Sequence, residues 1–227
     1  MFEGFSEATI DFLYGISFNN ERMWFNAHKE DYVNYLYQPM KVLAGEVFDA
    51  VLDRCPDRDL LCKVSRIYRD ARRCHGMSPY RDHLWFSFLP PVENWQDAPG
   101  FWFELQRGGW SYGMGLFAPK AATMARHRAL IDAHPQRLSD LYGRLLDQSE
   151  FLLEGESYAR FKPCATVPLA GWYNMKRFNL CHESDDVSET FDGPALVRRL
   201  TDGFVFLMDY YDYFYPLCAA AQGPNPS

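Results

Sequence analysis

The sequence lacks any apolar run long enough to cross a membrane. Its longest strongly apolar stretch, FVFLM at 204–208, falls far short of the ~20 residues that a bilayer requires. The first residues, MFEGFSEAT, carry an acid where a secretory signal carries positive charge, and they lack an apolar segment. We therefore expect a cytoplasmic protein without membrane attachment.

The common cofactor motifs are also missing. There is no P-loop, no G-x-G-x-x-G opening a helix, no H-E-x-x-H and no EF-hand loop. The six cysteines include no C-x-x-C pair, and we expect them to be reduced thiols. Cys74-His75 and Cys181-His182 could supply four zinc ligands, but adjacent ligands on a strand point to opposite faces. We expect no metal and no cofactor.

The chain is rich in the residues that build a core. Of its 227 residues, 48% are hydrophobic and 17% aromatic, which is enough to bury a large interior. No internal repeat or low-complexity linker divides it. We expect a single α+β domain over residues 1–218, followed by a disordered tail at 219–227. The sequence does not define an oligomeric state.

Hydrophobic spacing separates helical from extended segments. Helical spacing predicts helices at 6–16, from Asn19 or Asn20 onward, and at 39–54, 120–133, 136–148 and 194–215. Period-two spacing predicts strands at 64–69, 84–89, 101–106 and 110–117, with another near 178–182. The predicted fold has N-terminal helices, a mostly antiparallel sheet of four or five strands, and C-terminal helices packed on one face.

The strands at 101–106 and 110–117 are expected to form a hairpin. A turn at Gly108-Gly109 would pair Arg107 with Trp110 and give one apolar core face. On the other face, Glu104 would then lie opposite Gly113, and Trp102 opposite Gly115. A strand face without side chains admits either a closely packed element or a ligand.

The strongest local signal is the stretch KVSRIYRDARRCHGMSPYR at 63–81. It carries a net charge of +5 in a chain of −7, which leaves −12 on the remainder. Arginine forks bind phosphate or carboxylate, so a small anion is the predicted ligand. The alternative is an ion-pair network around Asp70 with no ligand, in a structural or interaction protein. The acidic remainder argues against nucleic acid, which needs a broad positive face.

The predicted anion site combines this stretch with the hairpin. Its floor is the strand with the two glycines, Glu104 is its acidic member and a candidate general base, and the PYR turn brings the chain back to the sheet. The predicted ligand-binding residues are Arg66, Arg69, Arg72, Tyr80, Arg81, Glu104, Gly113 and Gly115.

A weaker alternative is a serine hydrolase. GWSYG at 109–113 matches the G-x-S-x-G pattern, with Ser111 as the nucleophile and Asp140 and His182 following in a permissible order. That motif requires a sharp turn from a strand into a helix. Here Ser111 falls inside a predicted strand, so we do not expect this activity.

Four motifs give the chain a family resemblance. They are FLYGISFNNERMWF, RIYRDAR, PYR and GMGLFAP, in this order. With them the chain resembles a family of conserved hypothetical proteins catalogued as domain of unknown function 2461. Arg73 and Gly76-Met77 depart from the family pattern, which has an aromatic and an Asp-Lys pair there. The resemblance implies an α+β fold and a cytoplasmic location, and it implies no reaction.

Overall fold

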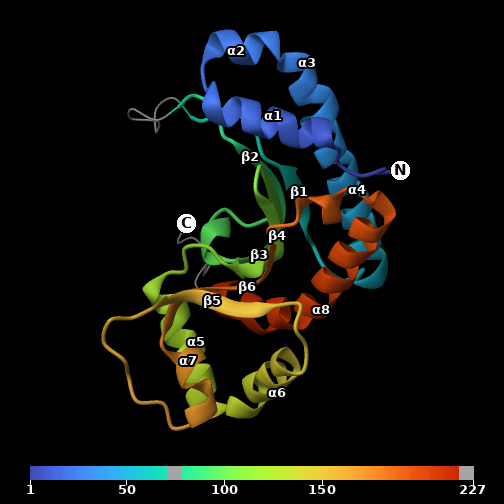
Figure 1. Ribbon diagram of the computed structural model, residues 1–227. Helices are drawn as coiled ribbons and strands as arrows, with labels where there is room; N and C mark the ends of the chain where they lie inside the picture. The colour runs from blue at the N-terminus through green and yellow to red at the C-terminus, as the bar shows by residue number, and fades with distance from the viewer. Residues whose placement is uncertain (71–77, 220–227) are drawn as a thin grey trace, which may run out of the picture. The chain divides into compact units, whose positions relative to one another are not determined.

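A computed structural model of the protein describes residues 1–70 and 78–219. Within these ranges the chain forms helices and a six-stranded antiparallel sheet, with strand order β1-β2-β3-β4-β6-β5 (Figure 1). The predicted α+β class is confirmed, although the sheet has six strands instead of four or five. No described helix is both long and apolar enough to span a membrane.

The first half of the chain begins with helices and ends with strands. In order, the elements are α1 (Glu7–Phe18), α2 (Arg22–Ala27), α3 (Lys29–Asp31), the π-helix η1 (Tyr32–Tyr37), α4 (Gln38–Arg54), β1 (Leu61–Val64), β2 (His83–Leu89), η2 (Trp95–Asp97), β3 (Pro99–Gln106) and β4 (Gly109–Leu116).

The second half begins and ends with helices. Its elements are α5 (Ala121–Ala133), α6 (Pro135–Leu146), β5 (Leu152–Ser157), η3 (Val167–Leu169), α7 (Ala170–Tyr173), β6 (Met175–Ser184), η4 (Val187–Thr190) and α8 (Gly193–Ala219). The tail predicted at 219–227 lies, apart from Ala219, outside the described residues.

Residue contacts divide the chain into two compact units. Unit 1 comprises Met1–Phe88, Trp102–Tyr112 and Glu183–Asp202, and unit 2 comprises Leu89–Phe101, Gly113–His182 and Gly203–Ser227. Strands β3, β4 and β6 and helix α8 each contribute residues to both units. The single domain expected from the sequence stays a prediction.

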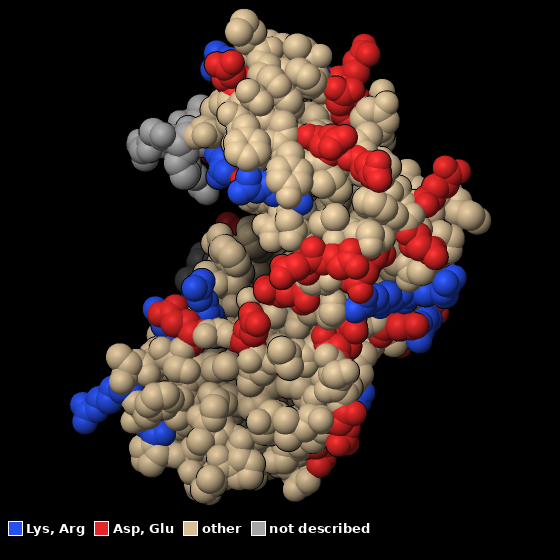
Figure 2. All heavy atoms as spheres, viewed as in Figure 1, with Lys and Arg blue, Asp and Glu red and all other residues tan. Residues whose placement is uncertain are grey.

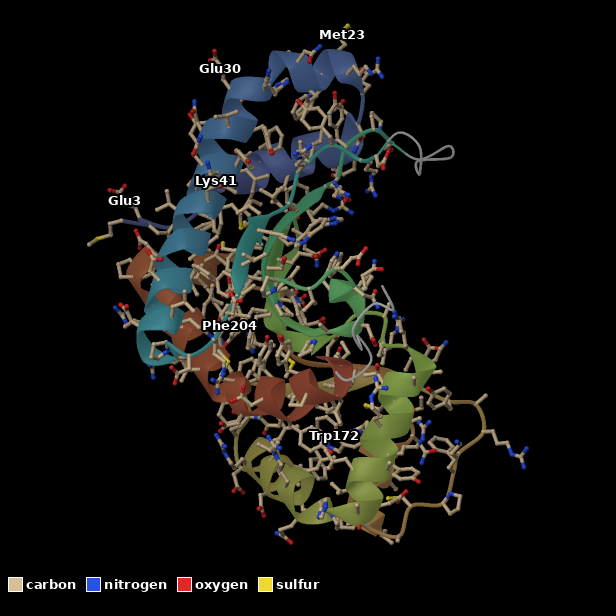
Figure 3. All side chains as sticks on the ribbon, turned by 180° about the vertical axis from the view of Figure 1, so that it is seen from behind. Glu3, Met23, Glu30, Lys41, Trp172 and Phe204 are labelled. Atoms are coloured by element: carbon tan, nitrogen blue, oxygen red, sulfur yellow. The ribbon has the colours of Figure 1, made fainter. Side chains whose placement is uncertain are left out.

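The core of unit 1 lies between the N-terminal helices and the strands. Helix α4 packs on β1, and Phe48 meets Phe88 with ring centroids 5.1 Å apart. Phe103 stacks on Phe86 at 5.4 Å, so β2 and β3 share this core. At the surface, Met23 projects from α2 and is 78% exposed (Figure 3). This unit therefore buries its apolar face by layering helices on strands.

Aromatic residues of α8, β3 and β6 form the core of unit 2. Phe204 and Tyr211 on α8 each lie 5.4 Å from Phe101. Phe178 on β6 lies 4.4 Å from Phe214. The Trp172 side chain points into this interior and is buried (Figure 3). Aromatic pairs at these distances stabilise a core beyond the area that they bury.

Acidic residues dominate the face of the molecule shown in Figure 2, where Lys and Arg occur in smaller groups. This distribution agrees with the formal net charge of −7.

Several sequence predictions need correction. Neither Asn19 nor Asn20 caps α2, whose N-cap is Glu21. The strand expected at 64–69 ends at Val64, and beyond it only an isolated bridge joins Tyr68 to Tyr80. The hairpin turn consists of Arg107 and Gly108, not Gly108 and Gly109. A regular two-residue turn of this kind places Glu104 opposite Ser111 and shifts the predicted register by two residues.

Candidate anion site

The candidate site is built on two segments, 65–70 and 78–82, which we call the arginine loop. Backbone hydrogen bonds align its segments with each other and with β2: Ser65 N–H to the Trp85 carbonyl (2.8 Å), Arg81 N–H to the Ile67 carbonyl (2.8 Å) and Arg69 N–H to the Pro79 carbonyl (2.9 Å). The loop is thus an extension of the sheet in unit 1. Arg72 lies outside the described residues, as does the Cys74-His75 pair considered for zinc.

Tyr80 is the fixed point of the loop. Asn20 donates through Nδ2 to the Tyr80 carbonyl at 3.1 Å and accepts the Tyr80 N–H at Oδ1 at 3.0 Å. The Tyr80 ring is buried and stacks on Phe25 at 4.2 Å. Burial raises the pKa of the Tyr80 hydroxyl. Tyr80 therefore anchors the loop from the core, and we treat it as a residue that positions the loop.

Arg81 braces the loop. Its Nη1 donates to the carbonyls of Arg66 and Tyr68, both at 2.6 Å. Its guanidinium also lies over the Trp85 ring, 5.0 Å from the centroid. Bonds from one guanidinium to two carbonyls fix the backbone conformation of 66–68. This observation favours the architectural interpretation for Arg81.

Arg69 is held along one edge only. Its Nε donates to the Tyr80 carbonyl at 3.0 Å, and its Nη2 lies 3.9 Å from Asp82 Oδ1. Within the described residues, its other N–H groups make no hydrogen bond. The side chain is half-buried, whereas Arg66 on the same segment is exposed. Arg69 thus keeps donors available on a guanidinium whose orientation is already set.

Acidic groups and a histidine lie beside the arginine loop. His83 Nδ1 lies 3.1 Å from Asp82 Oδ1. Burial alone would raise the pKa of Asp82, but hydrogen bonding to His83 and to its own backbone, with the charges of His83 and Arg69, lowers it. The Asp82-His83 pair therefore holds a negative charge next to Arg69.

Glu104 on β3 is the acidic member that the sequence predicted, and it is half-buried in unit 1. Burial raises its pKa, the charge of His83 opposes this, and the carboxylates of Asp82 and Glu183 raise it further. Such a carboxyl holds its proton to higher pH than an exposed glutamate and can donate a hydrogen bond. His83, Asp82, Glu104 and Glu183 thus form one electrostatic group.

The two glycines of the predicted floor lie against the backbone of a neighbouring strand. Gly113 and Gly115 belong to unit 2, and the backbone of β6 occupies the space above them. A Cβ at Gly113 would stand 2.2 Å from the Leu180 carbonyl oxygen, and one at Gly115 would stand 2.4 Å from that of Phe178. Of the two alternatives for a side-chain-free strand, these glycines serve close packing. We leave them out of the candidate site.

Ser111 does not have the setting of a nucleophile elbow. It lies inside β4, which runs to Leu116, and the next helix begins at Ala121. The elbow needs its serine on a tight turn directly before a helix. The structure therefore gives the G-x-S-x-G match no geometric support.

Sequence reasoning missed three residues beside the candidate site, Asn20, Asp82 and His83. Asn20 was expected to cap a helix, and Asp82 and His83 were not singled out although they follow PYR directly. The adjacency of Asp and His at the start of a strand was a usable signal. Asn20 gave no such signal, because its partner lies 60 residues away in the chain.

The model of the conserved hypothetical protein family DUF2461 matches residues 8–213. The chain belongs to this family, which confirms the resemblance seen in the sequence. No curated protein gives a significant match.

Proposed function

We propose that the protein binds a small anion, a phosphate or a carboxylate, at the arginine loop of unit 1. Arg69 and Arg66 are the proposed charged contacts. The observation that carries this proposal is the one-sided fixation of Arg69, which has donors without partners among the described residues. A guanidinium already oriented by Tyr80 loses little entropy when it takes up an oxyanion.

Glu104 gives the proposed site a dependence on pH. An anion bound nearby disfavours the ionised carboxylate, so binding and protonation of Glu104 support each other. The folded-state pKa of Glu104 is already raised by burial and by the neighbouring acids. Anion affinity should therefore increase as the pH falls through the pKa of Glu104.

The carboxylates of unit 1 favour a small molecule as the proposed partner. Asp82 lies beside Arg69, and the charges of Asp82 and Glu183 act on Glu104. A long polyanion would meet these carboxylates, and its affinity depends on displacing several counterions at once. A single phosphate or carboxylate needs only the donors of Arg69 and Arg66.

A cytoplasmic location is part of the same proposal. Cys62, Cys164 and Cys218 are free thiols. Burial raises the pKa of the Cys62 thiol to about 11 and of the Cys218 thiol to about 12. Free thiols are typical of proteins in a reducing compartment, and the raised pKa of these two makes them poorly reactive.

The architectural alternative is supported by Arg81, whose Nη1 bonds two backbone carbonyls. If Arg69 served the same purpose, removing it would strand the Asp82 charge and destabilise the protein. The anion-binding role and the architectural role of Arg69 therefore predict different effects of the same substitution on stability.

Thermal unfolding with and without inorganic phosphate tests the proposal. At a hundredfold excess over Kd, bound phosphate should raise Tm by about 5–10 °C. Arg69→Gln should fold normally, because Gln can still donate to the Tyr80 carbonyl, and should lose most of this rise. Arg66→Gln should lose part of it. Arg198→Gln removes the same charge from an exposed position on α8 in unit 1 and serves as the control.

Two results would refute the anion site. The first is a full phosphate effect in Arg69→Gln. The second is loss of the fold in Arg69→Gln and Arg66→Gln while Arg198→Gln stays folded, which would make the cluster architectural.

A further inference from the structure

Unit 2 contains a cavity of about 630 Å³ that no sequence motif indicated. It lies between α5 and the segment that follows β5, and its lining includes Arg128, Tyr158, Arg160, Phe161 and Lys162. Cavities that bind small molecules have volumes of roughly 300–1,000 Å³. The size of this cavity therefore suits a small organic ligand.

Positive charge and apolar surface line the cavity together. Arg128, Arg160 and Lys162 supply three cationic side chains, and none of the described lining residues is acidic. Ala121, Ala159 and Pro163 supply apolar walls. Phe161 is 66% exposed although its ring is entirely apolar. Cations beside apolar surface indicate a ligand with a charged end and an apolar body.

Arg128 shows that the charge in this cavity lacks a partner. Its Nη1 is buried and makes no hydrogen bond to any described residue. Its guanidinium lies over the Tyr158 ring at 5.5 Å. Asp132, one turn further along α5, accepts the hydroxyl of Tyr173 at 3.0 Å instead of pairing with Arg128. A buried donor without a partner is costly, and a bound acceptor relieves that cost.

The charge of Arg128 also acts on the histidine beside it in the chain. Burial lowers the pKa of the neighbouring His127 to about 4, and the charge of Arg128 contributes to this lowering. Nδ1 and Nε2 of His127 face the Tyr213 hydroxyl and the Trp172 carbonyl.

The wall opposite α5 is held in place by Asn174. Its Oδ1 accepts the Lys162 N–H at 2.7 Å, and its Nδ2 donates to the Lys162 carbonyl at 3.0 Å. The backbone N–H of Tyr158 donates to the Asn174 carbonyl at 3.0 Å. Because the backbone carries these bonds, the Lys162 side chain remains exposed beside the cavity. A cavity whose loop is fixed in advance binds at lower entropic cost.

We propose that this cavity is a second anion site, which binds an organic anion composed of a phosphate or carboxylate head and a flat apolar body. Arg128 binds the head from the interior, and Lys162 and Arg160 bind it from the solvent side. Tyr158 and Phe161 contact the body. The inference is independent of the arginine loop, because every residue that carries it lies in unit 2.

Isothermal titration with phenyl phosphate and with benzoate tests the site. Arg128→Gln should weaken the binding of phenyl phosphate by about tenfold or more, since a hydrogen bond to a charged group is lost. Lys162→Gln should weaken it by about threefold to tenfold and should not affect folding, because Asn174 contacts only the Lys162 backbone. Lys176→Gln is the matched control in unit 2, since this exposed lysine pairs with Glu156 on the surface.

Arg66→Gln separates this site from the arginine loop: it should weaken only the binding of phenyl phosphate at the arginine loop, and the binding that Arg128→Gln weakens should remain. Loss of all phenyl phosphate binding in Arg66→Gln would place the bound anion in the arginine loop and overturn the proposal. So would the absence of any heat from both ligands at millimolar concentration. If Arg128→Gln does not fold, an unchanged affinity in Lys162→Gln alone refutes the site. Tighter binding of one ligand supports the site and identifies its preferred head group.

Discussion

Each unit uses one asparagine side chain to hold both backbone groups of a single loop residue. In unit 1, Asn20 bonds the N–H and the carbonyl of Tyr80. In unit 2, Asn174 does the same for Lys162 and adds a bond to the Ala170 carbonyl at 3.1 Å. The loops differ in how nearby arginines are used. Arg81 is bonded to its own loop, whereas Nη1 of Arg128 has no partner among the described residues.

This difference separates an arginine whose donor braces its own loop, Arg81, from one whose buried donor has no partner among the described residues, Arg128. The arginine loop carries the higher charge density in the sequence, but Nη1 of Arg81 donates its hydrogen bonds to backbone carbonyls. Arg128 follows Arg126 and His127 in a predicted helix, and no motif marks it in the sequence. Local charge density in the sequence therefore does not show which donors the fold leaves unpaired.

The largest expected effect concerns the response of unit 2 to acid. His127 has a folded-state pKa of about 4, below the ordinary value of 6.5. Folding favours the neutral imidazole, so the contribution of His127 to the free energy of unfolding is complete above pH 6.5 and is lost as the pH falls toward 4. This contribution amounts to about 3 kcal/mol. His127→Gln should remove this share of the pH dependence, measured as the difference between wild-type and variant urea unfolding at pH 7 and pH 4. Parallel pH curves for the two proteins would show that His127 does not titrate on unfolding.

The two asparagines give a direct comparison of the loops. Asn174 is 3% exposed and makes three hydrogen bonds to backbone, so Asn174→Ala should cost roughly 2–3 kcal/mol. Asn20→Ala removes two bonds at a half-buried position and should cost about 1–2 kcal/mol. Urea unfolding gives both free energies. Hydrogen exchange should show faster opening near Lys162 in the first variant and near Tyr80 in the second, and exchange that rises equally at both loops would contradict the assignment.

The smallest expected effect is that of Glu104 in unit 1, and it has the opposite sign from that of His127. Because burial raises its folded-state pKa, the stability that its protonated form supplies is present below its ordinary pKa of 4.5 and is lost as the pH rises through the folded value. Glu104→Gln should therefore raise Tm at pH 7 by a few degrees at most. The gain should vanish at pH 4, and a Tm at pH 7 below that of wild type would show that the carboxylate is stabilised by a partner.

Regular periodicity allowed much of the fold to be predicted. The alternation in β3 correctly placed Phe101, Phe103 and Leu105 in the core, and α8 was anticipated at 194–215 against an observed Gly193–Ala219. Strand β5, LLEGES, was missed because five of its six residues are exposed and no alternation marks it. The predicted hairpin turn was displaced by one residue, since Arg107 and Gly108 form it instead of two glycines.

The candidate sites were less predictable because they depend on long-range contacts. Arg66, Arg69 and Arg81 were found from charge alone, but only the structure shows which carbonyls occupy their donors. The cavity of unit 2 requires α5 and the segment after β5 to come together, and Asn174, twelve residues beyond Lys162, fixes that arrangement. Local propensity contains no information about such a contact.

The order in which the chain visits the two units has a consequence for experiments on isolated parts. Six alternating stretches of sequence build the units, and each unit draws on three of them. No single cleavage or stop codon could release either unit with its sequence complete. A gene fragment cut at any one position would lack strands or helical turns of the unit that it is meant to contain. The two proposed anion sites therefore have to be compared by point substitution in the whole chain.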